Sequence, residues 1–159
     1  MRKRFFTPMG LAVGAAIAAV YAVLTYVLAP ISYGAVQFRV AEAMTLLPIL
    51  MPEAIPGLFV GCLLANLLGG AGPLDVIFGS LTTLVAAVMT YFLKKNRYVA
   101  ALPPVILNAV VVGIILHVVN GVELWAAMGY VALGQAGVVY LLGLPLLKAM
   151  EKIDLFGKR

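Results

Sequence analysis

Long apolar runs, broken by proline and glycine, confine this chain to a membrane fold. Of its 159 residues, 64% are hydrophobic and 11% are charged, and the mean hydropathy is +1.11. A soluble domain is usually about half apolar and about a quarter charged. Because about 20 apolar residues span a bilayer, six spans leave room only for short connections. We therefore expect an all-α, polytopic membrane protein with a single domain, residues 1–159.

Breaks in the apolar pattern divide the chain into six expected transmembrane helices. They cover approximately residues 9–29, 37–50, 54–68, 74–93, 102–119 and 123–147. Proline supplies several of the boundaries, since it cannot continue a helix without losing a hydrogen bond. The second and third segments are short, and they could instead form one broken hairpin that dips into the membrane.

Basic residues predict how these helices are oriented. Ten of the eleven fall in three clusters, namely Arg2, Lys3 and Arg4; Lys94, Lys95 and Arg97; and Lys148, Lys152, Lys158 and Arg159. The positive-inside rule places such clusters in the cytoplasm. Four expected helices separate the first two clusters and two separate the last two, so six spans with both termini in the cytoplasm satisfy the rule. The net charge of +5 is explained in this way, and it gives no reason to expect a nucleic-acid partner.

The remaining basic residue, Arg39, lies three positions before Glu42 in an otherwise apolar segment. A charged side chain inside a membrane helix costs at least about 2.5 kcal/mol and usually faces the bundle interior or a wet cavity. Residues three apart on a helix can reach one another. The two side chains could therefore form a buried ion pair that locks helix packing, or they could belong to a binding site.

Polar residues collect in the outer half of the expected bundle and come from five of the six helices. The candidate substrate-binding residues are Gln37, Arg39, Glu42, Asn66, Asp75, His117, Asn120, Glu123 and Gln135. The inner half is almost entirely Leu, Val, Ala and Ile. This bias predicts a substrate cavity that opens to the outside, because packing hydrogen bonds alone would be scattered. His117 by itself could equally be a hydrogen-bonded interfacial residue.

Several of these candidates also have a structural explanation. Asp75 could complement the helix dipole in a first turn. Asn120 and Glu123 have the spacing of a capping box, with asparagine as the cap and glutamate at the third helical position. Asn66 and Gln135 could hold helices together by hydrogen bonds.

Small residues recur every fourth position on two expected helices, and small faces let helices approach closely in lipid. On the first helix they are Gly10, Gly14, Ala18 and Ala22, with offset rows Ala12 and Ala16, and Ala15 and Ala19. On the third helix they are Gly57, Gly61, Ala65 and Gly69. We expect the third helix to use its row inside the bundle. Because the first helix has more than one smooth face, we expect one of them to contact a partner protein.

Motifs for catalysis and nucleotide hydrolysis are missing. The chain has no phosphate-binding glycine loop, no nucleophile elbow and no HExxH sequence, and its lone Cys62 allows neither an internal disulfide nor a cysteine metal cluster. We expect no enzyme activity, no cofactor and no metal, and active transport would need energy from a partner.

Almost the whole chain resembles a known family, and the resemblance is densest at residues 34–84. The run GAVQFRVAEA at residues 34–43, with PEAIPG at 52–57, NLLGG at 66–70 and DVIFGS at 75–80, is similar to the QueT family. These proteins are substrate-binding S components of energy-coupling factor (ECF) transporters. The resemblance implies a six-helix S-component bundle in the bacterial cytoplasmic membrane, and a queuosine precursor as substrate, most simply 7-aminomethyl-7-deazaguanine. It also implies a membrane-embedded coupling protein and two ATPase subunits as partners. The coupling protein would be contacted through an A-x-x-x-A pattern on the first helix, matched here by Ala12 and Ala16 or by Ala15 and Ala19.

The chemistry of such a base suits the candidate residues. Its guanine-like edge and amine can be bound by carboxylates, here Glu42 with Asp75 or Glu123, and its carbonyl by Arg39 or a side-chain amide. Other functions remain open at this point. They are an S component for another small vitamin-like substrate, an ion-coupled secondary transporter with Glu42 and His117 as proton carriers, and a purely structural membrane subunit.

Overall fold

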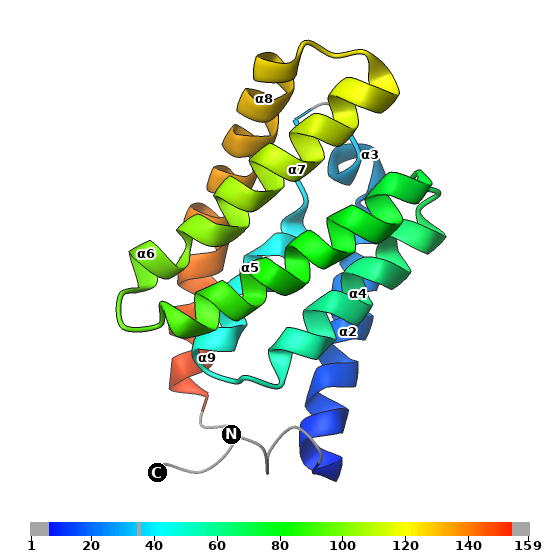
Figure 1. Ribbon diagram of the computed structural model, residues 1–159. Coiled ribbons are helices and arrows are strands. Elements are labelled where there is room, and N and C mark those ends of the chain that lie inside the picture. The colour runs from blue at the N-terminus through cyan, green and yellow to red at the C-terminus, as the bar shows by residue number, and fades with distance from the viewer. Residues whose placement is uncertain (1–6, 35, 154–159) are drawn as a thin grey trace.

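A computed structural model describes residues 7–34 and 36–153, and the regular structure in that part of the chain is helical throughout (Figure 1). The helices are α2 (Pro8–Val27), α3 (Ala29–Ser32), η1 (Val40–Ile49), α4 (Ala54–Leu68), η2 (Asp75–Gly79), α5 (Ser80–Phe92), α6 (Arg97–Ala100), α7 (Leu102–Asn120), α8 (Leu124–Ala136), η3 (Gly137–Gly143) and α9 (Leu144–Lys152). Five residues of the basic clusters lie outside the described part of the chain, namely Arg2, Lys3, Arg4, Lys158 and Arg159.

Four helical stretches are long and apolar enough to cross a membrane: Pro8–Val27, Asp75–Phe92, Arg97–Asn120 and Leu124–Lys152. They correspond to the first, fourth, fifth and sixth expected spans, and they make this a multi-pass membrane protein. The second and third expected spans are shorter helices, η1 with 10 residues and α4 with 15. These lengths correspond to about 20 Å of 3₁₀ helix and about 22 Å of α-helix, against a hydrocarbon core of about 30 Å.

The second segment differs from the ordinary helix that the sequence predicts from residue 37. It is a 3₁₀ helix that begins only at Val40, and its residues 41–48 are all buried. Gln37 and Arg39 lie in a non-helical stretch before it, and Gln37 has a positive φ of 47°, which is uncommon for a residue with a side chain. Because η1 packs against α2, α4, α5, η3 and α9, it lies at the centre of the bundle.

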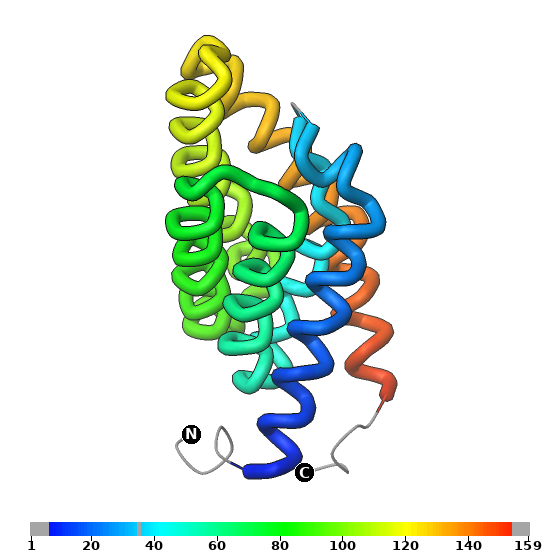
Figure 2. The backbone as a smooth tube through the Cα atoms, turned by 90° about the vertical axis from the view of Figure 1, so that its right-hand side faces the viewer, coloured from blue at the N-terminus to red at the C-terminus, as the bar shows by residue number. Residues whose placement is uncertain are grey.

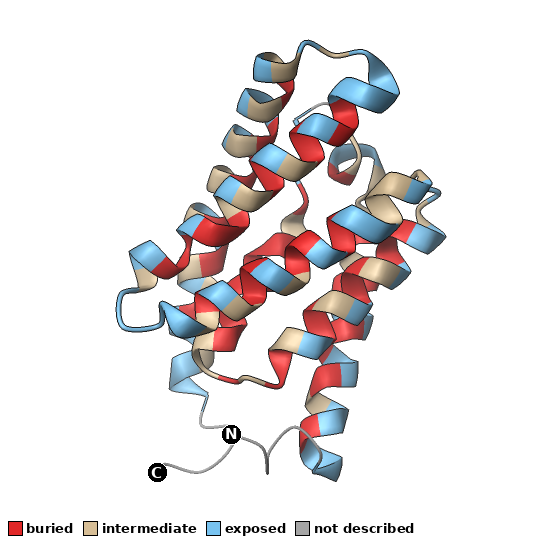
Figure 3. Cartoon of the chain, viewed as in Figure 1, coloured by how far each residue is buried: buried red, intermediate tan, exposed pale blue. Residues whose placement is uncertain are grey.

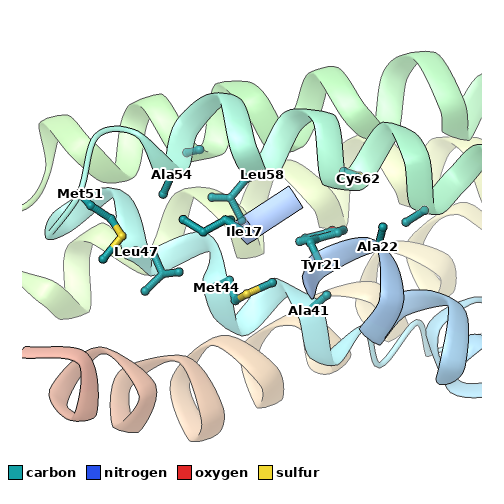
Figure 4. Close-up of a cluster of buried hydrophobic side chains, with 12 residues drawn as sticks. Ile17, Tyr21, Ala22, Ala41, Met44, Leu47, Met51, Ala54, Leu58 and Cys62 are labelled. Atoms are coloured by element: carbon teal, nitrogen blue, oxygen red, sulfur yellow. The ribbon is translucent and has the colours of Figure 1, made fainter. Parts of the chain in front are cut away.

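Helices α2 and α4 pack through their glycines. A Cβ atom on Gly61 would lie 2.8 Å from Tyr21 Cβ and 2.9 Å from the carbonyl oxygen of Ala18, and one on Gly57 would lie 2.5 Å from the carbonyl oxygen of Gly14. The prediction that the third helix uses its small residues inside the bundle is therefore confirmed. Figure 4 shows the adjoining core, in which Tyr21 and Leu58 lie among the buried side chains of α2, η1 and α4.

Helix α2 has one buried face and one exposed face. Figure 3 shows the burial of each residue in the bundle by colour. Its row of small residues at Gly10, Gly14, Ala18 and Ala22 is buried. The offset residues Ala12, Ala15, Ala16 and Ala19 are all exposed. One smooth face of the first helix thus packs within the protein, and a second is left open.

Basic residues gather at one end of the molecule. The α5–α6 connection, which carries Lys94 and Lys95, lies towards the end at which the chain begins and finishes (Figures 1 and 2). Arg97 joins this connection to α9 through an ion pair with Glu151, at 2.9 Å, next to Lys152. The described basic residues other than Arg39 therefore share one end, which agrees with the even number of crossings that the spacing of the last two clusters predicts.

Candidate functional site

A cavity of about 170 Å³ lies at the opposite end of the bundle. Its polar lining comes from Tyr33, Gln37, Asp75 and Asn120, and the turn at residues 69–72 and the apolar side chains of α7 complete it. An engineered cavity of about 150 Å³ is already large enough to admit benzene. This cavity can therefore hold one small aromatic ring without any rearrangement.

Tyr33 lines this cavity and also lies next to Arg39. It also lines a second space of about 110 Å³, together with Asn120 and Tyr130. Its hydroxyl donates to the carbonyl oxygen of Ala65 at 2.7 Å, and the guanidinium carbon of Arg39 lies 5.2 Å from its ring centre. Burial raises the pKa of the Tyr33 hydroxyl, which therefore remains a hydrogen-bond donor at neutral pH.

Arg39 is buried below this ring with only 7% of its surface exposed. Its Nη1 donates to Cys62 Sγ at 3.6 Å, and its Nε has no hydrogen-bond partner. Within the described residues no carboxylate oxygen lies within 4.0 Å of its guanidinium nitrogens. The ion pair between Arg39 and Glu42 that the sequence suggested is therefore not formed. Arg39 is the N-cap of η1 with extended backbone, and its carbonyl oxygen accepts from the backbone N–H of Glu42 at 2.9 Å, while the two side chains contact different neighbours.

Glu42 lies in the first turn of η1 and is 1% exposed. The hydroxyl of Tyr21 on α2 donates to its Oε1, whereas its Oε2 has no hydrogen-bond partner in the part of the chain that the structure describes. The carboxylate is thus half satisfied, although a buried polar atom without a partner costs about 1–3 kcal/mol. A side chain kept only to lock helix packing would be expected to use both of its oxygens.

Asn66 connects α4 to the π-helical turn η2, where Asp75 begins the fourth expected span. Its Nδ2 donates to the carbonyl oxygen of Asp75 at 2.9 Å, and its Oδ1 is buried without a partner among residues 7–34 and 36–153. Turns of this kind occur frequently at functional sites. Arg39, Glu42 and Asn66 together leave one donor and two acceptors unsatisfied, and such groups in a native structure need a specific explanation.

The sequence of this chain is similar to that of a known protein family. The sequence model described as QueT transporter matches residues 11–152. The chain belongs to the QueT transporter family. This confirms the resemblance seen in its motifs, and membership of a family of transporters confirms that the chain is not an enzyme.

A curated relative is the queuosine precursor transporter QueT of Lactococcus lactis subsp. cremoris (strain MG1363). It is 40% identical over 73 residues, which is 45% of this chain and 43% of the relative. The alignment thus spans less than half of the relative's length. No solved structure matches the chain.

Two of the predicted site residues have structural roles in this QueT-family chain. Glu123 is itself the N-cap of α8, where its carboxylate accepts from the backbone N–H of Ala126 at 2.8 Å. That bond lowers the pKa of the exposed Glu123 carboxyl. The predicted capping box, with Asn120 as the cap, is therefore wrong, because Asn120 ends α7 and lines the cavity. His117 is also exposed, and its Nδ1 lies 2.8 Å from the carbonyl oxygen of Val122.

Three residues outside the predicted set are hydrogen-bonded to the candidate site residues or to one another in this QueT-family chain. Tyr21 and Thr83 were not among the candidates, yet the first bonds Glu42 and the second lies 3.4 Å from Cys62 Sγ. Cys62 accepts from Arg39 Nη1 and is four residues from Asn66 on α4. The four-residue spacing of Cys62 and Asn66 on one expected helix was the sequence signal that could have identified Cys62. Gln135 is buried on α8, and its Oε1 has no hydrogen-bond partner among the residues that the structure describes.

Proposed function

We propose that this chain is the substrate-binding membrane subunit of an ECF-type importer and that it captures a queuosine precursor from outside the cell. The observation that carries the proposal is the set of unsatisfied buried polar atoms on Arg39, Glu42 and Asn66, of which Arg39 lies against Tyr33, a lining residue of the cavity. Family membership and the name of the Lactococcus lactis relative supply the substrate class.

The hydrogen-bonding pattern of 7-aminomethyl-7-deazaguanine complements this set. Its ring N–H and exocyclic amine are donors for Glu42 Oε2, and its carbonyl oxygen is an acceptor for the Arg39 guanidinium. Tyr33 offers the face on which the flat base stacks. Trp125, 76% exposed at the start of α8, is suited instead to the membrane interface.

Asp75 lines the cavity above Arg39, where it can bind the aminomethyl cation that projects from the base. Replacing Asp75 with Asn should lower the affinity for 7-aminomethyl-7-deazaguanine by about tenfold, because a charge-assisted hydrogen bond is lost. The affinity for the nitrile analogue, 7-cyano-7-deazaguanine, should change by less than about twofold, since a nitrile has no charge to pair. Titration calorimetry on the purified protein measures both. Absence of binding to either base by the wild-type protein would refute the proposed function, and equal losses for both bases would refute only the role of Asp75.

We further propose six crossings, with both termini in the cytoplasm of a bacterial cell. Helices η1 and α4 each become long enough for the bilayer only with their non-helical flanks, such as residues 36–39 before η1. Cysteine placed at Val36, exposed at the cavity end, should react with an impermeant maleimide in intact cells. Cysteine at Lys95 should react only after permeabilisation, and buried Cys62 supplies the background. The reverse labelling pattern would invert this topology.

The coupling protein is proposed to bind the exposed small face of α2, at Ala12, Ala15, Ala16 and Ala19. Beside that face, an apolar hollow of about 230 Å³ runs between α2 and α4, past Ala15, Pro56 and Val60. The coupling protein would connect the chain to the two ATPase subunits that drive uptake, since the chain has no nucleotide-binding loop of its own.

Enlarging this face should separate assembly from substrate binding. Ala15→Leu or Ala16→Leu should reduce co-purification with the coupling protein at least about tenfold, because close approach of helices in lipid depends on small residues. Affinity for the base should stay within about twofold of wild type. Val27→Leu, on the same helix and 68% exposed, is the matched control and should leave both unchanged. If the alanine variants lose substrate binding together with assembly, the face packs within the protein and contacts no partner.

A further inference from the structure

Three side-chain donors from three segments surround the sulfur of Cys62. Arg39 Nη1 and Asn66 Nδ2 each lie 3.6 Å from Sγ, and Thr83 Oγ1 lies 3.4 Å from it. Thr83 can also donate to the carbonyl oxygen of Gly79 at 3.2 Å. Cys62 is fully buried and is the one cysteine in the chain.

A thiol sulfur is only a weak hydrogen-bond acceptor. The buried guanidinium of Arg39 is therefore held more loosely than its five N–H groups allow, and its Nε has no partner. An isolated buried cation is costly unless it is paired and hydrogen-bonded. The acceptor that would satisfy Arg39 is thus not supplied by the described residues near it.

We propose that Cys62 is a positioning residue that keeps Arg39 in a weakly bonded resting arrangement, from which a carbonyl oxygen of the substrate takes over the guanidinium. The inference rests on the proposed function and adds a determinant of specificity to it. A carboxylate at position 62 would pair with Arg39 permanently, and an apolar side chain would leave it without an anchor. Sulfur directs the guanidinium and still releases it to a stronger acceptor, so the site should prefer a base with a carbonyl over one with an amine at that position.

The test compares 7-aminomethyl-7-deazaguanine with its 2,6-diamino analogue, in which an amine replaces the carbonyl. In the purified wild-type protein the carbonyl base should bind at least about tenfold more tightly, because the analogue leaves the buried guanidinium unpaired and also lacks the ring N–H that would donate to Glu42. Cys62→Ala should reduce this preference by weakening binding of the carbonyl base alone, while the part that comes from Glu42 remains. Cys62→Ser should restore the preference to within about threefold, because a hydroxyl is again an acceptor. Cys62→Asp should abolish binding of the carbonyl base. Leu58→Ala, also buried on α4, is the packing control and should affect both bases equally.

Each remaining result contradicts a definite part of the inference. If Cys62→Ala weakens both bases equally, as the packing control does, Cys62 acts only through packing and the proposal is overturned. Tight binding by Cys62→Asp would overturn it as well. If wild type binds both bases equally well, the substrate-binding function stands and the positioning role fails. If wild type binds neither base, the proposed function itself fails.

A measurement on the wild-type protein tests the same inference if the variants do not fold. Reaction of Cys62 with a small permeant maleimide should be at least about fivefold slower with saturating 7-aminomethyl-7-deazaguanine, because a base bound to Arg39 covers the sulfur that Arg39 contacts. An unchanged rate at saturation would place the base away from Cys62 and overturn the inference.

Discussion

Replacing Glu42 with Gln should lower the affinity for 7-aminomethyl-7-deazaguanine by about tenfold to a hundredfold. The substitution keeps the volume of the side chain and an oxygen that can accept from the Tyr21 hydroxyl. It removes the charge from the buried Oε2 that has no partner within the protein. Hydrogen bonds to charged groups contribute about 1.5–3 kcal/mol, which corresponds to this range of affinity. Titration calorimetry in detergent measures the effect.

The matched control for this prediction is Glu123→Gln. Glu123 is an exposed glutamate that caps α8, so its neutralisation should leave the affinity within about twofold of wild type. The comparison also distinguishes the two carboxylates that the sequence alone could not rank. Wild-type affinity in a folded Glu42→Gln protein would exclude Glu42 from the site.

Replacing Gly61 with Leu should prevent α2 and α4 from packing and should remove most of the folded protein. The first added carbon would already lie 2.9 Å from the carbonyl oxygen of Ala18, and a backbone atom cannot move aside as a side chain does. Overpacking of a core costs typically about 1–3 kcal/mol and occasionally more. Here we expect the upper end, because Tyr21 Cβ lies against the same position. Size-exclusion chromatography of the detergent extract and the unfolding temperature of the eluted protein report the loss.

Gly129→Ala serves as the control for a glycine substitution. Gly129 lies exposed on α8, and a Cβ atom added there meets nothing within 4 Å. We expect wild-type yield and an equal or slightly higher unfolding temperature, since alanine has the better helix propensity. A well-folded Gly61→Leu protein would show that the two helices can separate without loss of the fold, contrary to the packing described above.

Sequence alone was sufficient for the features that depend on local composition. Apolar length and proline breaks located the four long helices. The spacing of the basic residues predicted that the described basic clusters lie at one end of the bundle. Arg39 and Glu42 were recognised as candidate site residues because an ionisable residue within an apolar segment usually faces the bundle interior or a wet cavity. The QueT motifs could also be recognised from the sequence alone, because each of them is a run of adjacent residues.

Tertiary contacts decided what the periodicity of the chain leaves open. A repeat of small residues marks a face of α2 but does not say which face another helix will cover, and only the packing against Gly57 and Gly61 distinguishes the buried row from the exposed alanines. Helix η1 is a central 3₁₀ helix because it is enclosed by its neighbours, an arrangement that local propensity does not encode. The late start of η1 directs Arg39 to Cys62 and Glu42 to Tyr21, residues that lie 23 and 21 positions away in the chain. Hydrogen bonds over such separations depend on how the helices are assembled, and for that reason the unsatisfied atoms of the site could be identified only in the folded structure.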